Sequence, residues 1–272
     1  LVFQTDTENE FWTFKASLNV HDGKGAPVQL PDNVRMYFLS NFQHGGGDPG
    51  LEVPGHSEMC ANPTNPNYHG PTQRALLMAL DAWADRGVAP PTSRYPRVED
   101  KSLVTLDEYV KSFPAIPALA MTQVVTELYL HSFGPKFRST GGVVTDQTPA
   151  RGLKYLSLVP RADKDGLNVA GVRQMEVRVP LGTNMGWNVR AKGRREGNLC
   201  GLTGSFLPFA KTKAERVASS DPRESLEERY KDHQGYVNAV KKAAAELQTE
   251  GFLIAEDAER FVRSAEASRV LR

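Results

Sequence analysis

The sequence predicts an α/β fold, and three observations support this class. Two runs rich in apolar and β-branched residues, 1–5 and 34–39, have the composition of strands. Each run leads directly into a loop that carries acidic or histidine side chains. A helical pattern then begins at residue 71, and a helix at this point would pack back on the sheet formed by the two strands.

The elements of the predicted core follow one another within residues 1–90. Between the two strands, residues 11–32 predict an irregular excursion with a turn at 21–25. A loop rich in glycine and proline extends from residue 45 to residue 71. Pro71 then opens the helix, whose broad apolar face ends at Arg86 and Gly87.

Residues 91–272 predict an extension of mixed α+β structure that packs on this core. The turn signal at 161–166 lies between two apolar runs, 153–160 and 169–179, and indicates a β-hairpin. Residues 122–130 fit a strand or a helix. A short helix or turn is expected at 105–112, and helices are expected at 211–219, 225–231, 235–249 and 255–268.

The charge and hydropathy of the chain exclude some classes of partner. The 33 Lys and Arg residues nearly balance the 32 Asp and Glu residues, which leaves a formal net charge of +1. Such a chain has no overall field that would draw it to nucleic acid or to an anionic membrane. No apolar stretch reaches about 18 residues, the length that a transmembrane helix requires, so no membrane span is expected.

The chain contains two cysteines, Cys60 and Cys200, in loop-like contexts. Neither has a second Cys or a His beside it at the spacing of a metal site, and His56 and His69 are isolated, so we expect no metal and no cofactor. The two thiols are either paired or free. A disulfide would indicate an oxidising compartment and therefore a secreted or periplasmic protein.

His44 is the best candidate for a catalytic residue. It lies at a strand-to-loop junction and is followed by three glycines, which let backbone and substrate approach closely. An imidazole in this position can act as a general base near neutral pH. A loop histidine with a structural role, or one that is merely exposed, is the alternative.

A catalytic histidine needs an acid, and the loop after the first strand offers three. Glu8 is favoured because it lies past the end of the strand, where its side chain can turn toward the neighbouring loop. Asp6 is the alternative acid, since it also lies in the turn. Glu10 is less well placed in this interpretation.

With these residues in view, the sequence resembles the alpha/beta hydrolase domain family. The matching stretches run through nearly all of the chain and comprise residues 5–8, 40–44, 60–66, 74–83 with 90–96, 179–188, 204–209 and 221–230. The resemblance implies the C-terminal half of a serine hydrolase that acts on carboxylic esters or related acyl compounds. It implies Glu8 as the acid and His44 as the base, and it strengthens the pairing of Cys60 with Cys200.

The sequence departs from the family pattern at the nucleophile. No G-x-S-x-G motif occurs in the 272 residues, and the contexts of Ser139 and Ser205 lack the paired glycines of a nucleophile elbow. Both serines also follow His44, whereas the fold requires a nucleophile before the acid. We therefore expect the serine to lie upstream of residue 1, in an N-terminal half that this chain needs as a partner.

Three hypotheses remain at this point. The first is the incomplete hydrolase, inactive by itself and cut from a longer chain, because the sequence begins inside a predicted strand. The second is a non-catalytic binding or structural module of the same descent. The third is a self-contained enzyme with a downstream serine such as Ser205.

Overall fold

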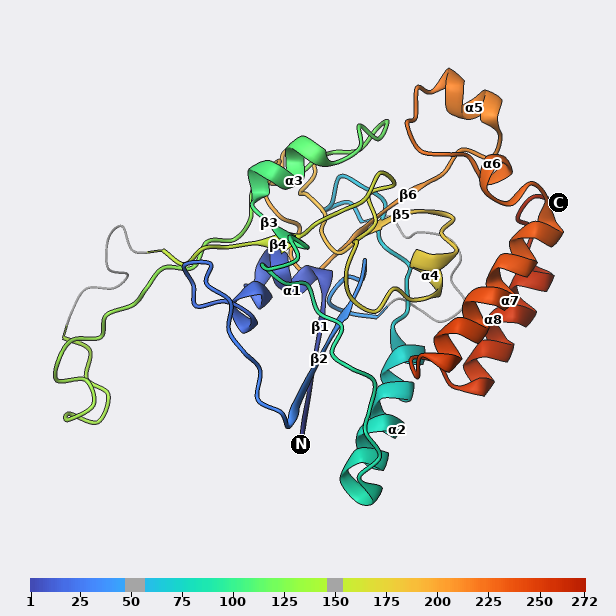
Figure 1. Cartoon of the computed structure of the whole chain (residues 1–272). Coiled ribbons are helices and arrows are strands. Elements are labelled where there is room, and N and C mark those ends of the chain that lie inside the picture. Colours follow the sequence, from blue (N-terminus) through green and yellow to red (C-terminus); the bar gives the residue numbers. More distant parts are fainter. Residues whose placement is uncertain (47–56, 146–153) are drawn as a thin grey trace.

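A computed structural model describes residues 1–46, 57–145 and 154–272. Its first two strands, β1 (Val2–Thr7) and β2 (Val34–Leu39), pair in parallel, in a register that runs from Val2 opposite Val34 to Thr7 opposite Leu39. Both predicted strands are therefore confirmed (Figure 1). In this register the carboxyl ends of the strands lie side by side, as do the loops that follow them.

The connection between the two strands differs from the prediction. The helix α1 (Glu8–Thr13) begins directly after β1, and the 3-10 helix η1 (Ala16–Asn19) follows it. The residues predicted to form the acid loop and the start of an irregular excursion are thus helical. The cause is a helix-start signal at Thr7, which is described with the candidate site below.

β2 has neighbours on both edges, whereas β1 has only one. Short parallel bridges join Tyr37 to Arg94 and Leu39 to Val172 on the edge of β2 away from β1. The outer edge of β1 has no strand partner among the described residues. Val2 on this strand is 48% exposed, although it is apolar.

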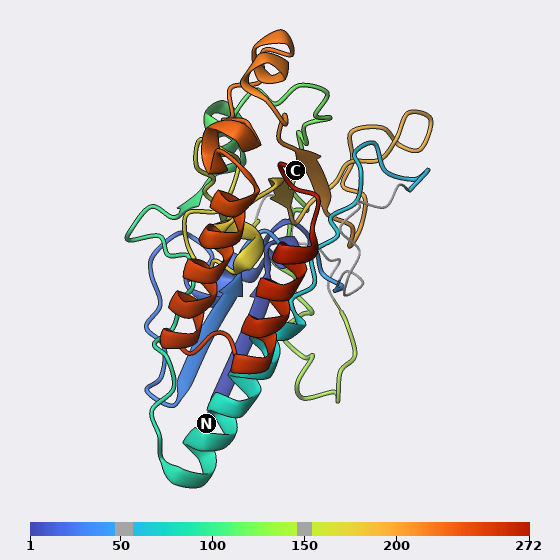
Figure 2. The same cartoon turned by 90° about the vertical axis from the view of Figure 1, so that its right-hand side faces the viewer.

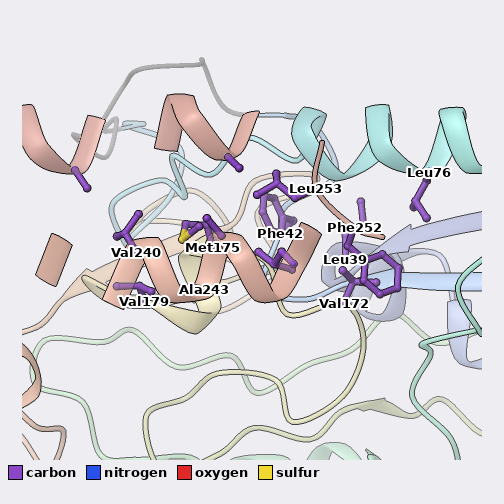
Figure 3. Packing of buried hydrophobic residues seen from close by; sticks show 14 of the residues in the cluster. Leu39, Phe42, Leu76, Val172, Met175, Val179, Val240, Ala243, Phe252 and Leu253 are labelled. Carbon is purple, nitrogen blue, oxygen red and sulfur yellow. The ribbon is translucent and has the colours of Figure 1, made fainter. Parts of the chain in front are cut away.

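Three long helices cover one face of the strand pair, and all three confirm predicted helices. They are α2 (Gly70–Arg86), α7 (His233–Thr249) and α8 (Ala255–Ala267). Figure 2 shows them in front of the strands, and Figure 3 shows Leu39 of β2 close to Phe252 and Val172. The same buried cluster contains Tyr37, Phe42, Leu76, Met175, Val179, Val237, Val240, Ala243, Ala244, Leu247 and Leu253.

The opposite face of β2 is covered by irregular chain and short helices. Met36 and Phe38 contribute to a second buried cluster with Phe11 of α1, Val20, Tyr95, Leu103 and Leu158. A third cluster joins Trp12 of α1 to Tyr109 and Trp187. Residues on both sides of position 90 share these clusters.

The remaining elements are short. They are β3 (Leu103–Val104), α3 (Leu106–Ser112), β4 (Val159–Pro160), α4 (Met175–Arg178), β5 (Gly182–Met185), β6 (Ser205–Pro208), α5 (Lys213–Ala218) and α6 (Leu226–Tyr230). β3 pairs antiparallel with β4, and β5 pairs antiparallel with β6. The helices α3, α5 and α6 confirm three of the predicted helical segments.

The prediction of a β-hairpin around residues 161–166 is wrong, because the two segments that flank the turn do not form a pair of strands. The turn exists, since an antiparallel bridge joins Ala162 to Asn168, but β4 pairs with β3 instead of the segment after the turn. That segment contains α4 instead of a strand. Residues 122–130 form neither a helix nor a strand, apart from a bridge between Tyr129 and Lys154. Thr122 is buried in the body, and the chain that follows these residues runs out into a long projection (Figure 1).

Candidate active site

His44 and an acidic residue do meet at the carboxyl ends of β1 and β2, and the acid is Glu10. Nδ1 of His44 is hydrogen bonded to Oε1 of Glu10. A carboxylate oxygen can only accept, so the Nδ1 atom carries the proton and donates it. The His44 side chain is 44% exposed, whereas that of Glu10 is 13% exposed, which places the imidazole at the surface and the acid behind it.

Local structure at the start of α1 fixes the carboxylate of Glu10. Thr7 is the N-cap of this helix, and Glu10 is the third helical residue, so the two form a capping box. The backbone N–H of Thr7 donates to Oε2 of Glu10 at 2.6 Å, and the Thr7 hydroxyl donates to the same oxygen. One carboxylate oxygen is therefore anchored by Thr7, and the other is left for His44.

The expected contact between Glu8 and His44 is not formed. Glu8 is fully buried, and its carboxylate accepts the N–H of Gly186 at 2.9 Å and the indole N–H of Trp12 at 3.3 Å. Burial raises the pKa of Glu8 to about 7, although these two hydrogen bonds act in the opposite direction. Because α1 begins at Glu8, this side chain shares a helix face with Trp12, four residues on, and turns into the core.

Asp6, the alternative acid, also lies away from His44. Its carboxylate accepts the hydroxyl proton of Tyr95 at 2.8 Å and amide protons of Gln4 and Asn19. Burial raises the pKa of Asp6, and the hydrogen bond from Tyr95 partly offsets this effect. Asp6 thus belongs to a buried polar cluster on the opposite side of the strand end.

The loop that carries His44 is turned by an asparagine. Asn41 adopts a left-handed backbone conformation with φ of 64°, which asparagine tolerates better than most residues. Its side chain donates to the carbonyl of Asn184 at 2.6 Å and accepts the backbone N–H of Asn168 at 2.9 Å. These bonds hold the chain in the sharp turn that brings His44 back over α1.

The other ring nitrogen of His44, Nε2, points to no partner among the described residues. No hydrogen bond to Nε2 occurs within residues 1–46, 57–145 and 154–272. The ring of Phe14 lies 5.5 Å from the imidazole, measured between centroids. A neutral imidazole with its Nδ1 proton on a carboxylate and a free Nε2 is the arrangement of a general base.

The remaining residues singled out by the sequence lie as follows. Cys60 and Cys200 form a disulfide, with their Cα atoms 5.8 Å apart, so their predicted pairing is confirmed. Ser205 is fully buried in β6, and its hydroxyl donates to the carbonyl of Trp187 at 2.6 Å. Ser139 is exposed in the projection and donates to the carbonyl of Lys136. His56 lies outside the described residues.

The described part of the chain holds no group of three or more His, Cys, Asp or Glu residues that could bind a metal ion together. None of its helices combines the length and the apolar character needed to cross a bilayer.

The sequence analysis favoured Glu8 over Glu10 as the acid, although the sequence contains a pattern that indicates Glu10. The run Thr7-Glu8-Asn9-Glu10 has the T-x-x-E pattern of a capping box. This pattern indicates that a helix starts at Glu8. It also places the side chain of Glu10, the third helical residue, against Thr7, the N-cap. Read in this way, it favours Glu10 as the acid at the strand end.

Comparison with known proteins gives a family and no individual relative. The sequence profile of the family described as "Alpha/beta hydrolase domain" matches residues 1–263. No curated protein and no solved structure matches the chain. The match covers nearly the whole sequence, and the parallel strands with helices on one face agree with it. The chain therefore belongs to the alpha/beta hydrolase domain family.

Proposed function

We propose that this chain supplies the catalytic acid and histidine of a serine hydrolase that acts on carboxylic esters or related acyl compounds. In this proposal His44 is the general base and Glu10, in place of Glu8, is the acid. The observation that carries the proposal is the contact between Nδ1 of His44 and a Glu10 carboxylate that Thr7 already holds in place.

In the proposed reaction, His44 transfers protons and Glu10 orients and stabilises the imidazole. Glu10 keeps the proton on Nδ1, so that Nε2 can accept the proton of an attacking serine hydroxyl and return it to the leaving group. When His44 becomes positively charged, the adjacent carboxylate stabilises it. The two remaining hydrogen bonds on Glu10 restrict the carboxylate and therefore the orientation of the ring.

The nucleophile in this proposal comes from a segment upstream of residue 1. Three observations support this source. The sequence contains no G-x-S-x-G motif, and Ser205 is buried with its hydroxyl engaged. The outer edge of β1 has no strand partner among the described residues, and a further parallel strand could join the sheet there. The chain alone is then inactive, and its partners are a small acyl substrate and the nucleophile-bearing segment.

The disulfide supports a proposal about the compartment in which the protein is found. Cys60 and Cys200 are both buried and joined, and structural disulfides persist mainly in oxidising compartments. A secreted or periplasmic protein is compatible with this bond. We propose that location for the hydrolase.

Three substitutions test the assignment in a hydrolase that joins this chain to its nucleophile-bearing segment. Glu10→Gln keeps the capping box, since Gln can replace Glu at this position, but it removes the carboxylate from His44. We expect kcat for a p-nitrophenyl ester to fall by roughly 10³ to 10⁴-fold, as for other triad acids. His44→Ala is expected to abolish turnover, and Glu8→Gln to leave kcat within about tenfold of the parent.

Each possible outcome separates the alternatives. A larger loss of kcat in Glu8→Gln than in Glu10→Gln would return the role of acid to Glu8. Turnover that survives His44→Ala would remove His44 from the mechanism. A joined protein that hydrolyses no ester would favour a non-catalytic module, and ester turnover by the present chain alone would require a nucleophile within it.

A further inference from the structure

The segment 200–204, here called the disulfide loop, contacts both halves of the candidate active site. The carbonyl of Leu202 accepts the backbone N–H of His44 at 3.4 Å. The carbonyl of Gly201 accepts a side-chain N–H of Asn9 in α1 at 3.3 Å. The backbone N–H of Gly204 donates to the side chain of Gln43 at 2.9 Å. One short loop therefore bonds to the segment that carries His44 and to the helix that carries Glu10.

The disulfide fixes one end of this loop. Cys200, the first residue of the loop, is bonded to Cys60, which follows His44 in the sequence. Backbone bonds hold both attachment points, because Cys200 donates to the carbonyl of Asn188 at 2.7 Å and Ala61 donates to that of Val189 at 2.8 Å. The chain on either side of the disulfide is thus anchored on the same neighbouring segment.

Two of the three hydrogen bonds from the disulfide loop to the site are long, and only the bond between Gly204 and Gln43, at 2.9 Å, has an ordinary length. A typical hydrogen bond contributes about 1 kcal/mol to stability, and bonds of 3.3 to 3.4 Å lie beyond the usual range of N–H···O distances. His44 itself is partly exposed and makes its only side-chain hydrogen bond within the described residues to Glu10. The position of its backbone therefore depends on whatever restricts the loop.

We propose that the Cys60–Cys200 disulfide is a positioning element for His44, because it holds the disulfide loop against the backbone of His44 and against α1. This inference rests on the proposed roles of His44 and Glu10, and it adds a covalent support to them. The disulfide takes no part in the reaction and needs no change of redox state. Its effect is to keep the imidazole on the Glu10 carboxylate.

The present chain allows a direct test that needs no catalysis. In the Cys60→Ser/Cys200→Ser variant, labelled with ¹⁵N-histidine, we expect the Nδ1 proton that His44 shares with Glu10 to broaden or disappear from the NMR spectrum. In the parent chain this proton is expected to give a distinct low-field resonance. Loss of the resonance in Glu10→Gln assigns it to the pair.

A matched control separates positioning from a general loss of stability. Val240→Ala truncates a buried side chain of α7, which makes no hydrogen bond to the disulfide loop. It should lower the melting temperature and leave the Nδ1 resonance unchanged. Spectra are compared at a temperature at which circular dichroism shows that all variants are folded. An unchanged resonance in the folded double serine variant would overturn the proposal.

A second variant keeps the disulfide and weakens the loop contact, in case the double variant does not fold. Gln43→Ala removes the acceptor for the N–H of Gly204. We expect faster solvent exchange of the Nδ1 proton in this variant than in the parent chain, and an unchanged exchange rate in Gln43→Ala would contradict the inference.

The catalytic readout distinguishes this proposal from the proposed function. In the joined hydrolase, the double serine variant should lower kcat with little change in KM, since it misplaces His44 and leaves substrate binding alone. If His44→Ala retains turnover, the proposed function fails, but the NMR comparison still decides whether the disulfide positions His44. If His44→Ala abolishes turnover and the double variant keeps full kcat, only the positioning role is wrong.

Discussion

At the scale of single residues, two carboxylates two positions apart have opposite environments. Glu8 is fully buried beside Trp12, whereas Glu10 is 13% exposed and lies behind the imidazole of His44. Residues two apart on a helix point to different sides, so the helix start at Glu8 decides which acid turns inward and which remains at the strand end.

The buried carboxyl of Glu8 predicts a pH dependence of stability. Its pKa is raised by burial from 4.5 to about 7, so between these values the folded state keeps a proton that the unfolded chain releases. The stabilisation is fully present below pH 4.5 and is lost as the pH rises through about 7. The loss amounts to about 3 kcal/mol on the order-of-magnitude scale of 1.4 kcal/mol per pKa unit.

Glu8→Gln imitates the protonated carboxyl and should remove this dependence. Chemical unfolding of the parent and of Glu8→Gln at pH 5 and pH 8 measures the difference. We expect the parent to lose more stability than the variant between the two pH values. Glu176, whose pKa burial also raises to about 7, contributes equally to both proteins and cancels in the comparison. Equal losses would show that Glu8 is ionised in the folded protein at pH 5.

At the scale of elements, the long periodic segments could be predicted and the short ones could not. The helices α2, α7 and α8 each repeat an apolar face over three or more turns, which gives a strong signal. α1 has only six residues, so its apolar pattern is brief and its cap is the main indication. The missed helix is the reason that the sequence favoured Glu8 over Glu10.

The failed hairpin has a related cause. The sequence around 161–166 carries the turn signal, and the structure does contain the turn. Local signals do not specify which strand partners meet, however. β4 finds its partner in β3, more than 50 residues earlier, and α4 has only four residues and little pattern of its own. The pairing of β4 with β3 and the formation of α4 both depend on tertiary contacts, which a short stretch of sequence does not reveal.

Gly186 marks a point at which elements around the site approach each other closely. A Cβ atom at this position would lie 2.5 Å from Cβ of Glu8, 2.6 Å from the backbone nitrogen of Asn9 and 2.6 Å from the carbonyl oxygen of Phe42. Two of these atoms belong to the backbone and cannot rotate away. The start of α1 and the segment before His44 would both have to move.

We therefore expect Gly186→Ala to lower the free energy of unfolding by roughly 1 to 3 kcal/mol, the cost of overpacking a tight site. Gly45→Ala is the matched control, because a Cβ there meets no atom of the described residues within 4 Å. Urea unfolding of both variants measures the difference. Equal stability of the two variants would contradict the close packing of α1 against Gly186.

At the scale of the whole molecule, the asymmetry of the strand pair is the main feature. Helices α2, α7 and α8 cover one face of the strands, and the Phe38 side is buried by chain from four other segments (Figure 2). The faces are thus closed, and β2 has neighbours on both edges. Only the outer edge of β1 is open within the described residues.

An open edge on a parallel strand is unusual, since parallel sheets are generally covered and extended on both sides. The backbone of β1 indicates which groups would receive a further strand. Val2 donates its N–H toward Asn33 on the β2 side, and backbone groups alternate along a strand. The N–H of Gln4 therefore also faces β2, whereas those of Phe3 and Thr5 face the open edge.

Hydrogen exchange followed by NMR tests whether the proposed nucleophile-bearing segment joins the sheet at this edge. In the present chain, the amides of Phe3 and Thr5 should exchange nearly as fast as in an unstructured peptide, whereas that of Gln4 should be protected. In the joined hydrolase, we expect Phe3 and Thr5 to become protected by about 100-fold or more, because a ladder hydrogen bond must open before exchange. Gln4 serves as the internal control, since its partner on β2 is present in both proteins. Rapid exchange of Phe3 and Thr5 in an active joined hydrolase would mean that the nucleophile reaches His44 from another side of the molecule.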